Sequence, residues 1–190
     1  IREEIIAARK DGKTIITYLP TFRESESKFF EVMDLEAFDS FLGEKNCVLV
    51  AKLHPKSRIR AAFESVNGNN IINANSELDL YSFFDLCDML ITDYSSAYTD
   101  FMHTMKPSIA FDFDWEEYIS ESRGCYIDQD EYMPELKATT MDELMEMISR
   151  ALVCDERKEA RLKSRERMFK YIEGCSCKRM AGMIRELARI

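Results

Sequence analysis

The segment MLITDYSSAYTDFMHTMKPSIAFDF, residues 89–113, contains two short apolar runs separated by a stretch whose apolar residues recur every three or four positions. A short run that is apolar throughout is typical of a strand buried on both faces, whereas the three-to-four periodicity is typical of a helix. The segment therefore predicts a strand, a helix and a second strand. The polar group TDYSS lies at the first junction, where a strand would end and a helix would begin.

The same alternation extends toward the amino terminus. It is seen in strand-like runs at 14–19, 47–53 and 70–73 and in helix-like segments at 34–45, 57–66 and 79–87. Strands and helices that take turns, with strands apolar throughout, predict a parallel sheet covered by helices on both faces. The expected fold class is therefore α/β, a doubly wound parallel sheet.

The carboxyl-terminal part of the chain, from Met141 onward, has helical periodicity only. Thr140 and Glu143 have the spacing of a capping box, in which each side chain bonds to the other residue's backbone amide at the start of a helix. No repeat, low-complexity tract or linker rich in proline, glycine and serine divides the sequence. We therefore expect one domain over residues 1–190, including a helical tail over residues 141–190.

The composition indicates a globular chain, since 46% of the 190 residues are hydrophobic and only six are glycine and four proline. No apolar run approaches the roughly 20 residues of a membrane-spanning helix. The first residues, IREEIIAARKDGK, are typical of an amphipathic helix rather than of a signal peptide. We therefore expect a soluble chain cut from a longer protein.

The net charge of -9 argues against nonspecific binding to nucleic acid or to an anionic membrane over the whole surface. The charge is uneven, because residues 155–190 contain eleven Lys and Arg against six Asp and Glu. This basic part fits either a pair of solvated helices or a docking surface for a partner or membrane.

The six cysteines form no C-x-x-C pair, and the single residue between Cys175 and Cys177 suits a zinc site poorly. The sequence therefore predicts no metal site and a reducing cytoplasmic environment.

Polar residues follow four of the predicted strands. They form the groups PTFR (20–23), HP (54–55), TDYSS (92–96) and DFDWEEY (112–118). Open parallel sheets bind ligands beyond the carboxyl ends of their strands, where loops and helix amino termini meet. We therefore expect a binding site at this edge of the sheet.

The TDYSS group has two interpretations. Ser95 or Ser96 stands where the helix begins, and the free amides and hydroxyls of such a first turn form a phosphate-binding site. Alternatively, Asp93 or Ser95 only caps the helix. Under the first interpretation, Asp100 orients the loop or contacts the anion. The candidate substrate-binding residues in this region are Thr92, Asp93, Tyr94, Ser95, Ser96 and Asp100.

His54 leaves the second strand directly before Pro55, which restricts the backbone and ends the strand. Its imidazole could stabilise or protonate a leaving phosphate, or it could be an ordinary core histidine. Lys52 and Pro55, in the same motif, are candidate substrate-binding residues. The other histidine, His103, lies within a predicted helix and fits a helix-face position.

Two loop arginines could supply positive charge to the site. Thr21 and Arg23 follow the proline that closes the first strand, and a guanidinium is well shaped for a forked contact with phosphate. Arg123 precedes Gly124, and a tight turn there would bring a charge or the backbone close to a ligand. Either arginine could instead be an ordinary surface residue.

Three common motifs are missing from the sequence: the G-x-S-x-G elbow of serine hydrolases, the Walker loop G-x-x-x-x-G-K-[ST] and the dinucleotide fingerprint G-x-G-x-x-G. The residues at the strand ends therefore predict recognition of a diphosphate by backbone amides, hydroxyls and arginine.

Five motifs in this order, YLPTFR, KLHP, DLYSFFDLCDMLITDYSSAYTDF, KPSIAFDFDWEEY and RGCYID, resemble the CDP-glycerol glycerophosphotransferase family, which builds polymers of the teichoic acid type. The resemblance covers nearly the whole chain and ends in FKYIEGCSCKRM. It implies a Rossmann-like lobe of the glycosyltransferase B (GT-B) architecture, here the carboxyl-terminal, donor-binding lobe, with the amino-terminal acceptor lobe absent. Glu173 stands where the family commonly has Asp, and the cysteines at 175 and 177 are unusual there.

By this resemblance, His54 would be the catalytic residue at the donor phosphate, and Ser95 and Ser96 with their amides would hold the diphosphate. Arg23 and Arg123 would supply positive charge. The implied reaction transfers glycerol phosphate from CDP-glycerol to an acceptor hydroxyl, with release of CMP and without a cofactor, and CDP-ribitol fits the motifs equally.

The resemblance also implies the surroundings of the reaction. The acceptor would be a polyol phosphate or a lipid-linked chain. The enzyme would be cytoplasmic and peripheral at the inner face of the cell membrane, in contact with it through the absent lobe. This chain alone would bind donor but hardly turn over.

Two other functions fit parts of the sequence. UDP-sugar GT-B glycosyltransferases and UDP-N-acetylglucosamine 2-epimerases share a similar phosphate-binding helix, although their usual glycine-rich loop is replaced here by PTFR. A non-catalytic docking lobe is the other alternative, and the basic tail supports it.

Overall fold

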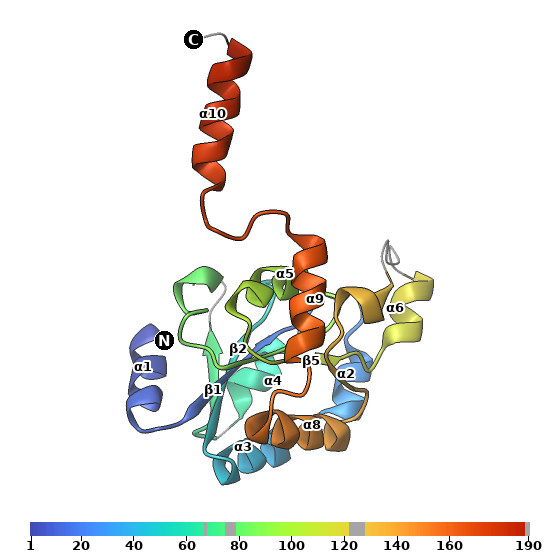
Figure 1. Ribbon diagram of the computed structural model, residues 1–190. Helices are drawn as coiled ribbons and strands as arrows, with labels where there is room; N and C mark the ends of the chain where they lie inside the picture. The colour runs from blue at the N-terminus through green and yellow to red at the C-terminus, as the bar shows by residue number, and fades with distance from the viewer. Residues whose placement is uncertain (67, 75–78, 122–127, 189–190) are drawn as a thin grey trace.

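A computed structural model describes residues 1–66, 68–74, 79–121 and 128–188 of the chain (Figure 1). It contains a six-stranded sheet in which all neighbouring strands are parallel, in the order β3-β2-β1-β4-β5-β6. The strands are β1 (Thr14–Leu19), β2 (Cys47–Lys52), β3 (Ile71–Ala74), β4 (Met89–Thr92), β5 (Ser108–Phe111) and β6 (Leu136–Ala138). The doubly wound α/β fold expected from the sequence is therefore confirmed.

Successive side chains of each strand point to opposite faces of the sheet, and each face is covered by its own group of helices. In β1, Ile16 and Tyr18 belong to one buried cluster, whereas Ile15 and Leu19 belong to the other. The first cluster includes side chains of α2 (Ser27–Val32), α3 (Leu35–Glu44), α4 (Arg60–Ser65) and α8 (Met141–Val153). The second includes side chains of α1 (Arg2–Lys10), α5 (Ala97–Phe101), α7 (Gln129–Tyr132) and two 3-10 helices, η1 (Leu80–Ser82) and η2 (Met102–Thr104).

The segment 79–87 differs from its expected structure, because only the short helix η1 forms there and the prediction of a full helix is wrong. The Asp79 carboxylate accepts a hydrogen bond from the Tyr81 amide, and the Ser82 hydroxyl donates to the Asp79 carbonyl. Such local bonds between side chains and backbone compete with a continuing helix.

The structure contains several short elements that the sequence did not predict. These are β6, α2, α7 and α6 (Trp115–Glu121). Each has seven residues or fewer, which is too short a stretch to show a clear period.

The tail contains the three expected helices, namely α8, α9 (Lys158–Met168) and α10 (Ser176–Ala188). The capping box of α8 is confirmed, since the Thr140 side chain accepts from the Glu143 amide and the Glu143 carboxylate accepts from the Thr140 amide. α10 extends away from the sheet and buries none of its residues (Figure 1). Within the described ranges, every helix is too short or too polar to span a bilayer.

Candidate functional site

The polar groups that follow the strands meet at the carboxyl edge of the sheet. β1 lies between β2 and β4, so the loops that leave these three strands are neighbours. Together they line a cavity of about 510 Å³. The lining includes seven of the predicted site residues: Thr21, Lys52, His54, Pro55, Tyr94, Ser95 and Ser96. The structure therefore brings most of the predicted site together around one hollow.

The other predicted site residues have different positions. Arg23, Thr92, Asp93 and Asp100 are not among the described residues that line this cavity. Arg123 and Gly124 lie outside the described residues.

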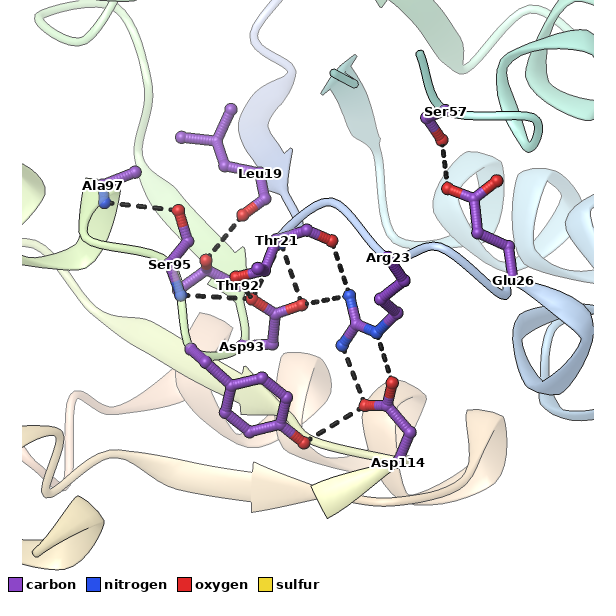
Figure 2. Close-up of polar contacts among 11 residues, drawn as sticks. Leu19, Thr21, Arg23, Glu26, Ser57, Thr92, Asp93, Ser95, Ala97 and Asp114 are labelled. Carbon is purple, nitrogen blue, oxygen red and sulfur yellow. Dashed lines mark hydrogen bonds and ion pairs between the residues drawn. The ribbon is translucent and has the colours of Figure 1, made fainter. Parts of the chain in front are cut away.

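Asp93 joins the exits of β1 and β4. Its buried carboxylate accepts hydrogen bonds from the Thr21 amide at 2.9 Å, from the Thr21 hydroxyl at 2.7 Å and from the Ser95 amide at 3.2 Å. Thr92 adds a second link between the same strands, because its buried hydroxyl donates to the Leu19 carbonyl at 2.6 Å (Figure 2). Thr92 and Asp93 therefore hold the TDYSS loop against the end of β1.

The two serines of TDYSS have different environments. The Ser95 hydroxyl accepts a hydrogen bond from the Ala97 amide at 3.3 Å, which is the local bond of a capping side chain. Ser96 is the N-cap residue of α5, but its side chain makes no capping bond and is exposed. The capping interpretation thus describes Ser95, whereas the Ser96 hydroxyl lies at the cavity beside the start of a helix, where the backbone dipole favours an anion.

His54 is exposed at the end of β2, which argues against the alternative of an ordinary core histidine. Its Nδ1 accepts a hydrogen bond from the Lys56 amide at 3.2 Å, so the neutral ring carries its proton on Nε2. The ring packs against Phe22, with 4.8 Å between the ring centroids. Nearby, partial burial lowers the pKa of the Lys52 ammonium. An Nε2–H at the rim of the cavity can donate to a phosphate oxygen.

Arg23 is the centre of an ion-pair group with Asp93 and Asp114 (Figure 2). Its Nη1 lies 2.8 Å from the Asp93 carboxylate and donates to the Thr21 carbonyl at 2.7 Å. Its Nη2 donates to one oxygen of Asp114 at 2.8 Å, and its Nε donates to the other. The Tyr94 hydroxyl also donates to Asp114, at 3.1 Å. The forked contact expected with a phosphate is therefore made with Asp114, and direct phosphate binding by Arg23 stays a prediction.

The sequence alone assigns no role to Asp112 or Asp114, although both lie in the group DFDWEEY at the end of β5. Both are buried. One Asp112 oxygen accepts from the Gln129 amide group at 3.2 Å, whereas the other has no hydrogen-bond partner among the described residues. Burial raises the pKa of Asp112. The sequence feature that could have indicated a role is the pair of aspartates directly after an apolar strand, because acidic residues are rarely buried.

Asp100 and His103 do not line the cavity, and each contacts another part of the chain. The Asp100 carboxylate accepts from the Tyr81 hydroxyl at 2.8 Å, so it joins α5 to η1, and this bond raises the pKa of Tyr81. His103 is exposed and its ring centroid lies 4.2 Å from that of Phe169. The helix-face position predicted for His103 is therefore confirmed.

The cavity lining includes the imidazole of His54, the ammonium group of Lys52, the two serines of TDYSS and the start of a helix. Such a set can bind a phosphate group and donate hydrogen bonds to its oxygens. In the described part of the chain, no group of three or more His, Cys, Asp and Glu side chains is arranged to hold a metal ion.

Comparison with known proteins groups the chain with enzymes of polymer synthesis. A family model described as CDP-Glycerol:Poly(glycerophosphate) glycerophosphotransferase matches residues 3–186. The teichoic acid ribitol-phosphate polymerase TarL of Staphylococcus aureus is 27% identical over 174 residues, which cover 89% of this chain and 30% of TarL. The teichoic acid poly(glycerol phosphate) polymerase of Bacillus spizizenii is 28% identical over 156 residues, which cover 77% of this chain and 38% of that protein. The chain thus spans about a third of the length of these relatives.

Two solved structures show the same fold. The wall teichoic acid polymerase TagF, in a variant soaked with CDPG, has a TM-score of 0.74 at 22% identity, over 97% of this chain and 47% of that chain. The complex of Staphylococcus aureus MnaA with UDP has a TM-score of 0.60 at 18% identity, over 97% of this chain and 48% of that chain. The six-stranded sheet described above is therefore a Rossmann-like domain that corresponds to about half of each of these GT-B-like proteins.

Proposed function

The chain belongs to the CDP-glycerol:poly(glycerophosphate) glycerophosphotransferase family of teichoic acid polyol-phosphate transferases, and from that membership we propose that it is the donor-binding lobe of such an enzyme. An acceptor-binding lobe would lie outside these 190 residues, as the greater length of the relatives supports. By itself the chain would bind donor without efficient turnover.

The reaction proposed is the transfer of glycerol phosphate from CDP-glycerol. The acceptor hydroxyl oxygen forms a new bond to the phosphorus of the glycerol phosphate group, and the bond from that phosphorus to the bridging oxygen of CMP breaks. The acceptor hydroxyl loses its proton to water, and the CMP phosphate leaves with the electron pair of the broken bond. Ribitol phosphate from CDP-ribitol is the alternative group, because relatives of both kinds match the chain.

The observation that supports this proposal is the convergence of His54, Ser95 and Ser96 on one cavity. The Ser96 hydroxyl and the start of α5 would hold the diphosphate, with Lys52 supplying positive charge. His54 would donate a hydrogen bond from its Nε2–H to the leaving phosphate oxygen and so stabilise the charge that develops there, since its Nδ1 accepts from a backbone amide. The shared fold with TagF, a polymerase whose crystals were soaked with CDPG, supports a cytidine diphosphate donor for this lobe.

Other parts of the proposal concern partners and place. The acceptor would be a polyol phosphate or a lipid-linked chain held by the other lobe. Arg123 and Gly124 would contact the donor from their loop, as the family motif implies. The enzyme would work at the inner face of the cell membrane as a peripheral protein, with membrane contact through the other lobe.

The substitution His54→Ala tests the proposal in the full-length enzyme. We expect turnover to fall by about 100-fold or more, because the donor of a hydrogen bond to the leaving phosphate is lost, while donor affinity changes less. His103→Ala is the matched control, since this histidine lies against Phe169 and does not line the cavity, and its loss should leave turnover unchanged. Full activity of both His54→Ala and Ser96→Ala would favour a docking lobe without catalytic function.

Calorimetry on the 190-residue chain tests the donor. Titration with CDP-glycerol, CDP-ribitol and a UDP sugar should show binding of a cytidine donor in preference to the UDP sugar. Preferential binding of the UDP sugar would instead support the alternative of a UDP-sugar enzyme, which the fold shared with the UDP complex of MnaA suggests.

A further inference from the structure

Glu26, in the loop after β1, binds the turn that carries His54. One oxygen of its carboxylate accepts from the Ser57 hydroxyl at 2.5 Å, and the other accepts from the amides of Arg58 and Ile59 at 2.6 and 3.0 Å. Figure 2 shows the first of these bonds. Three donors of one short segment thus converge on a single carboxylate from a loop more than 30 residues earlier in the chain.

The segment bound by Glu26 is continuous with His54. The Ser57 amide donates to the His54 carbonyl at 2.9 Å, which closes a tight turn, and the Lys56 amide of the same turn donates to His54 Nδ1 at 3.2 Å. The amide that fixes the proton on Nε2 therefore belongs to the turn that Glu26 holds. A shift of this turn would move the imidazole and loosen the bond that selects its tautomer.

The loop that presents Glu26 is itself fixed. Arg23 anchors it to the exits of β4 and β5 through Asp93 and Asp114. Phe22, in the same loop, packs on the His54 ring, and Phe22, Glu26, His54 and Ser57 all line one small cavity of about 10 Å³. The loop therefore contacts the His54 ring through Phe22, and it binds the segment that follows His54 through Glu26.

We propose that Glu26 is a positioning residue for His54, which sets the place and tautomer of the imidazole toward the leaving phosphate. The inference rests on the proposed function, in which His54 acts on that phosphate. Glu26 would touch neither donor nor acceptor, because its two oxygens are taken by the turn. Removing the carboxylate leaves the hydroxyl of Ser57, only 9% exposed, without its acceptor, so the turn would rearrange to find another.

The test is a double-mutant cycle in the full-length enzyme, with CDP-glycerol as donor. We expect Glu26→Ala to lower kcat by about 10- to 100-fold, the usual range for a misplaced catalytic group, with little change in donor KM. Glu26→Gln should lose less, because its amide oxygen keeps one acceptor for the turn. Glu24→Ala, which removes an exposed glutamate of the same loop, should leave kcat unchanged.

The decisive measurement is the effect of Glu26→Ala in a protein that already carries His54→Ala. A residue that acts through His54 causes no further loss there, whereas a residue that only stabilises the fold lowers activity by the same factor in both backgrounds. An equal loss in both backgrounds, or an unchanged kcat for Glu26→Ala, would overturn the inference. Should Glu26→Ala fail to fold, Glu26→Gln and Ser57→Ala each take its place in the cycle. The effect of each on kcat is then compared between the unchanged enzyme and the His54→Ala enzyme.

The two proposals fail by different results. If His54→Ala alone leaves turnover unchanged, the proposed function fails and the cycle has no basis. If His54→Ala lowers turnover to a measurable residual rate and Glu26→Ala lowers that rate by the same factor as in the unchanged enzyme, only the positioning role of Glu26 fails.

Discussion

Arg23 provides a direct test of how the site is built, because its guanidinium suits a phosphate but is bonded to carboxylates. The substitution Arg23→Ala leaves Asp93 and Asp114 with exposed side-chain fractions of 2% and 7% and no cation between them. Breaking a buried ion pair by removing one partner costs about 3–5 kcal/mol. Because Thr21 and Tyr94 still donate hydrogen bonds to these carboxylates, we expect a loss in the lower half of this range. For a chain of 190 residues, such a loss lowers the melting temperature by roughly 6–16 °C.

The measurement is urea unfolding at neutral pH, followed by circular dichroism. Arg167→Ala is the matched control, because it removes the same side chain from an ion pair with Glu131 whose members are 63% and 53% exposed. An exposed pair of this kind contributes less than about 1 kcal/mol, so the control should unfold nearly as the unchanged chain does.

The same two variants are then titrated with CDP-glycerol. If Arg23 bound phosphate directly, Arg23→Ala would abolish donor binding while its free energy of unfolding stayed equal to that of the Arg167→Ala control. That combination would refute the assignment of Arg23 as the residue that braces the loop. A large loss of stability supports a structural role for Arg23 in this loop. In that case the folded fraction of the Arg23→Ala protein would still bind donor, but with lower affinity.

Two further substitutions test the buried charges elsewhere. Arg161→Ala should lower the free energy of unfolding by about 3–5 kcal/mol, measured by urea unfolding, because the fully buried guanidinium pairs with the buried Glu135 and with Asp155. An effect no larger than that of Arg167→Ala would contradict this expectation. Asp112→Asn should make stability less dependent on pH: burial raises the folded-state pKa of Asp112 above its unfolded value, so its contribution is lost as pH rises through the folded pKa. Relative to the unchanged chain, the variant should gain stability as the pH rises above about 4, the ordinary pKa of an aspartate, and a stability difference that does not change with pH would contradict this expectation.

The fold could be predicted because five of the six strands are apolar at nearly every position. In β2, for example, Val48, Leu49 and Val50 are all buried although they point to alternate faces, and only a sheet covered on both sides produces that pattern. β6 could not be predicted in this way. It has three residues, of which the middle one, Lys137, is exposed, as is common in an edge strand.

The edge that carries the site could also be predicted, because parallel strands place all their carboxyl ends together. The partners of individual side chains could not. Arg23 and Asp114 are 91 residues apart, and the same fork of N–H groups fits a carboxylate as well as a phosphate. Glu26 lies in a polar run, RESESK, whose pattern is that of an exposed loop. Only the arrangement in space shows that its carboxylate has three donors.

The order of the strands explains why these unpredicted contacts gather in one loop. His54 follows β2 and Ser96 follows β4, and these strands are not neighbours, because β1 lies between them. The loop after β1 is therefore the segment that can contact both exits at once. It does so with two charged side chains three positions apart: Glu26 binds the turn after β2, and Arg23 binds Asp93 after β4. A change at Arg23 or Glu26 would alter the distance between His54 and the phosphate-binding serines without replacing any of them, and the charges of these two loop residues are accordingly used within the protein.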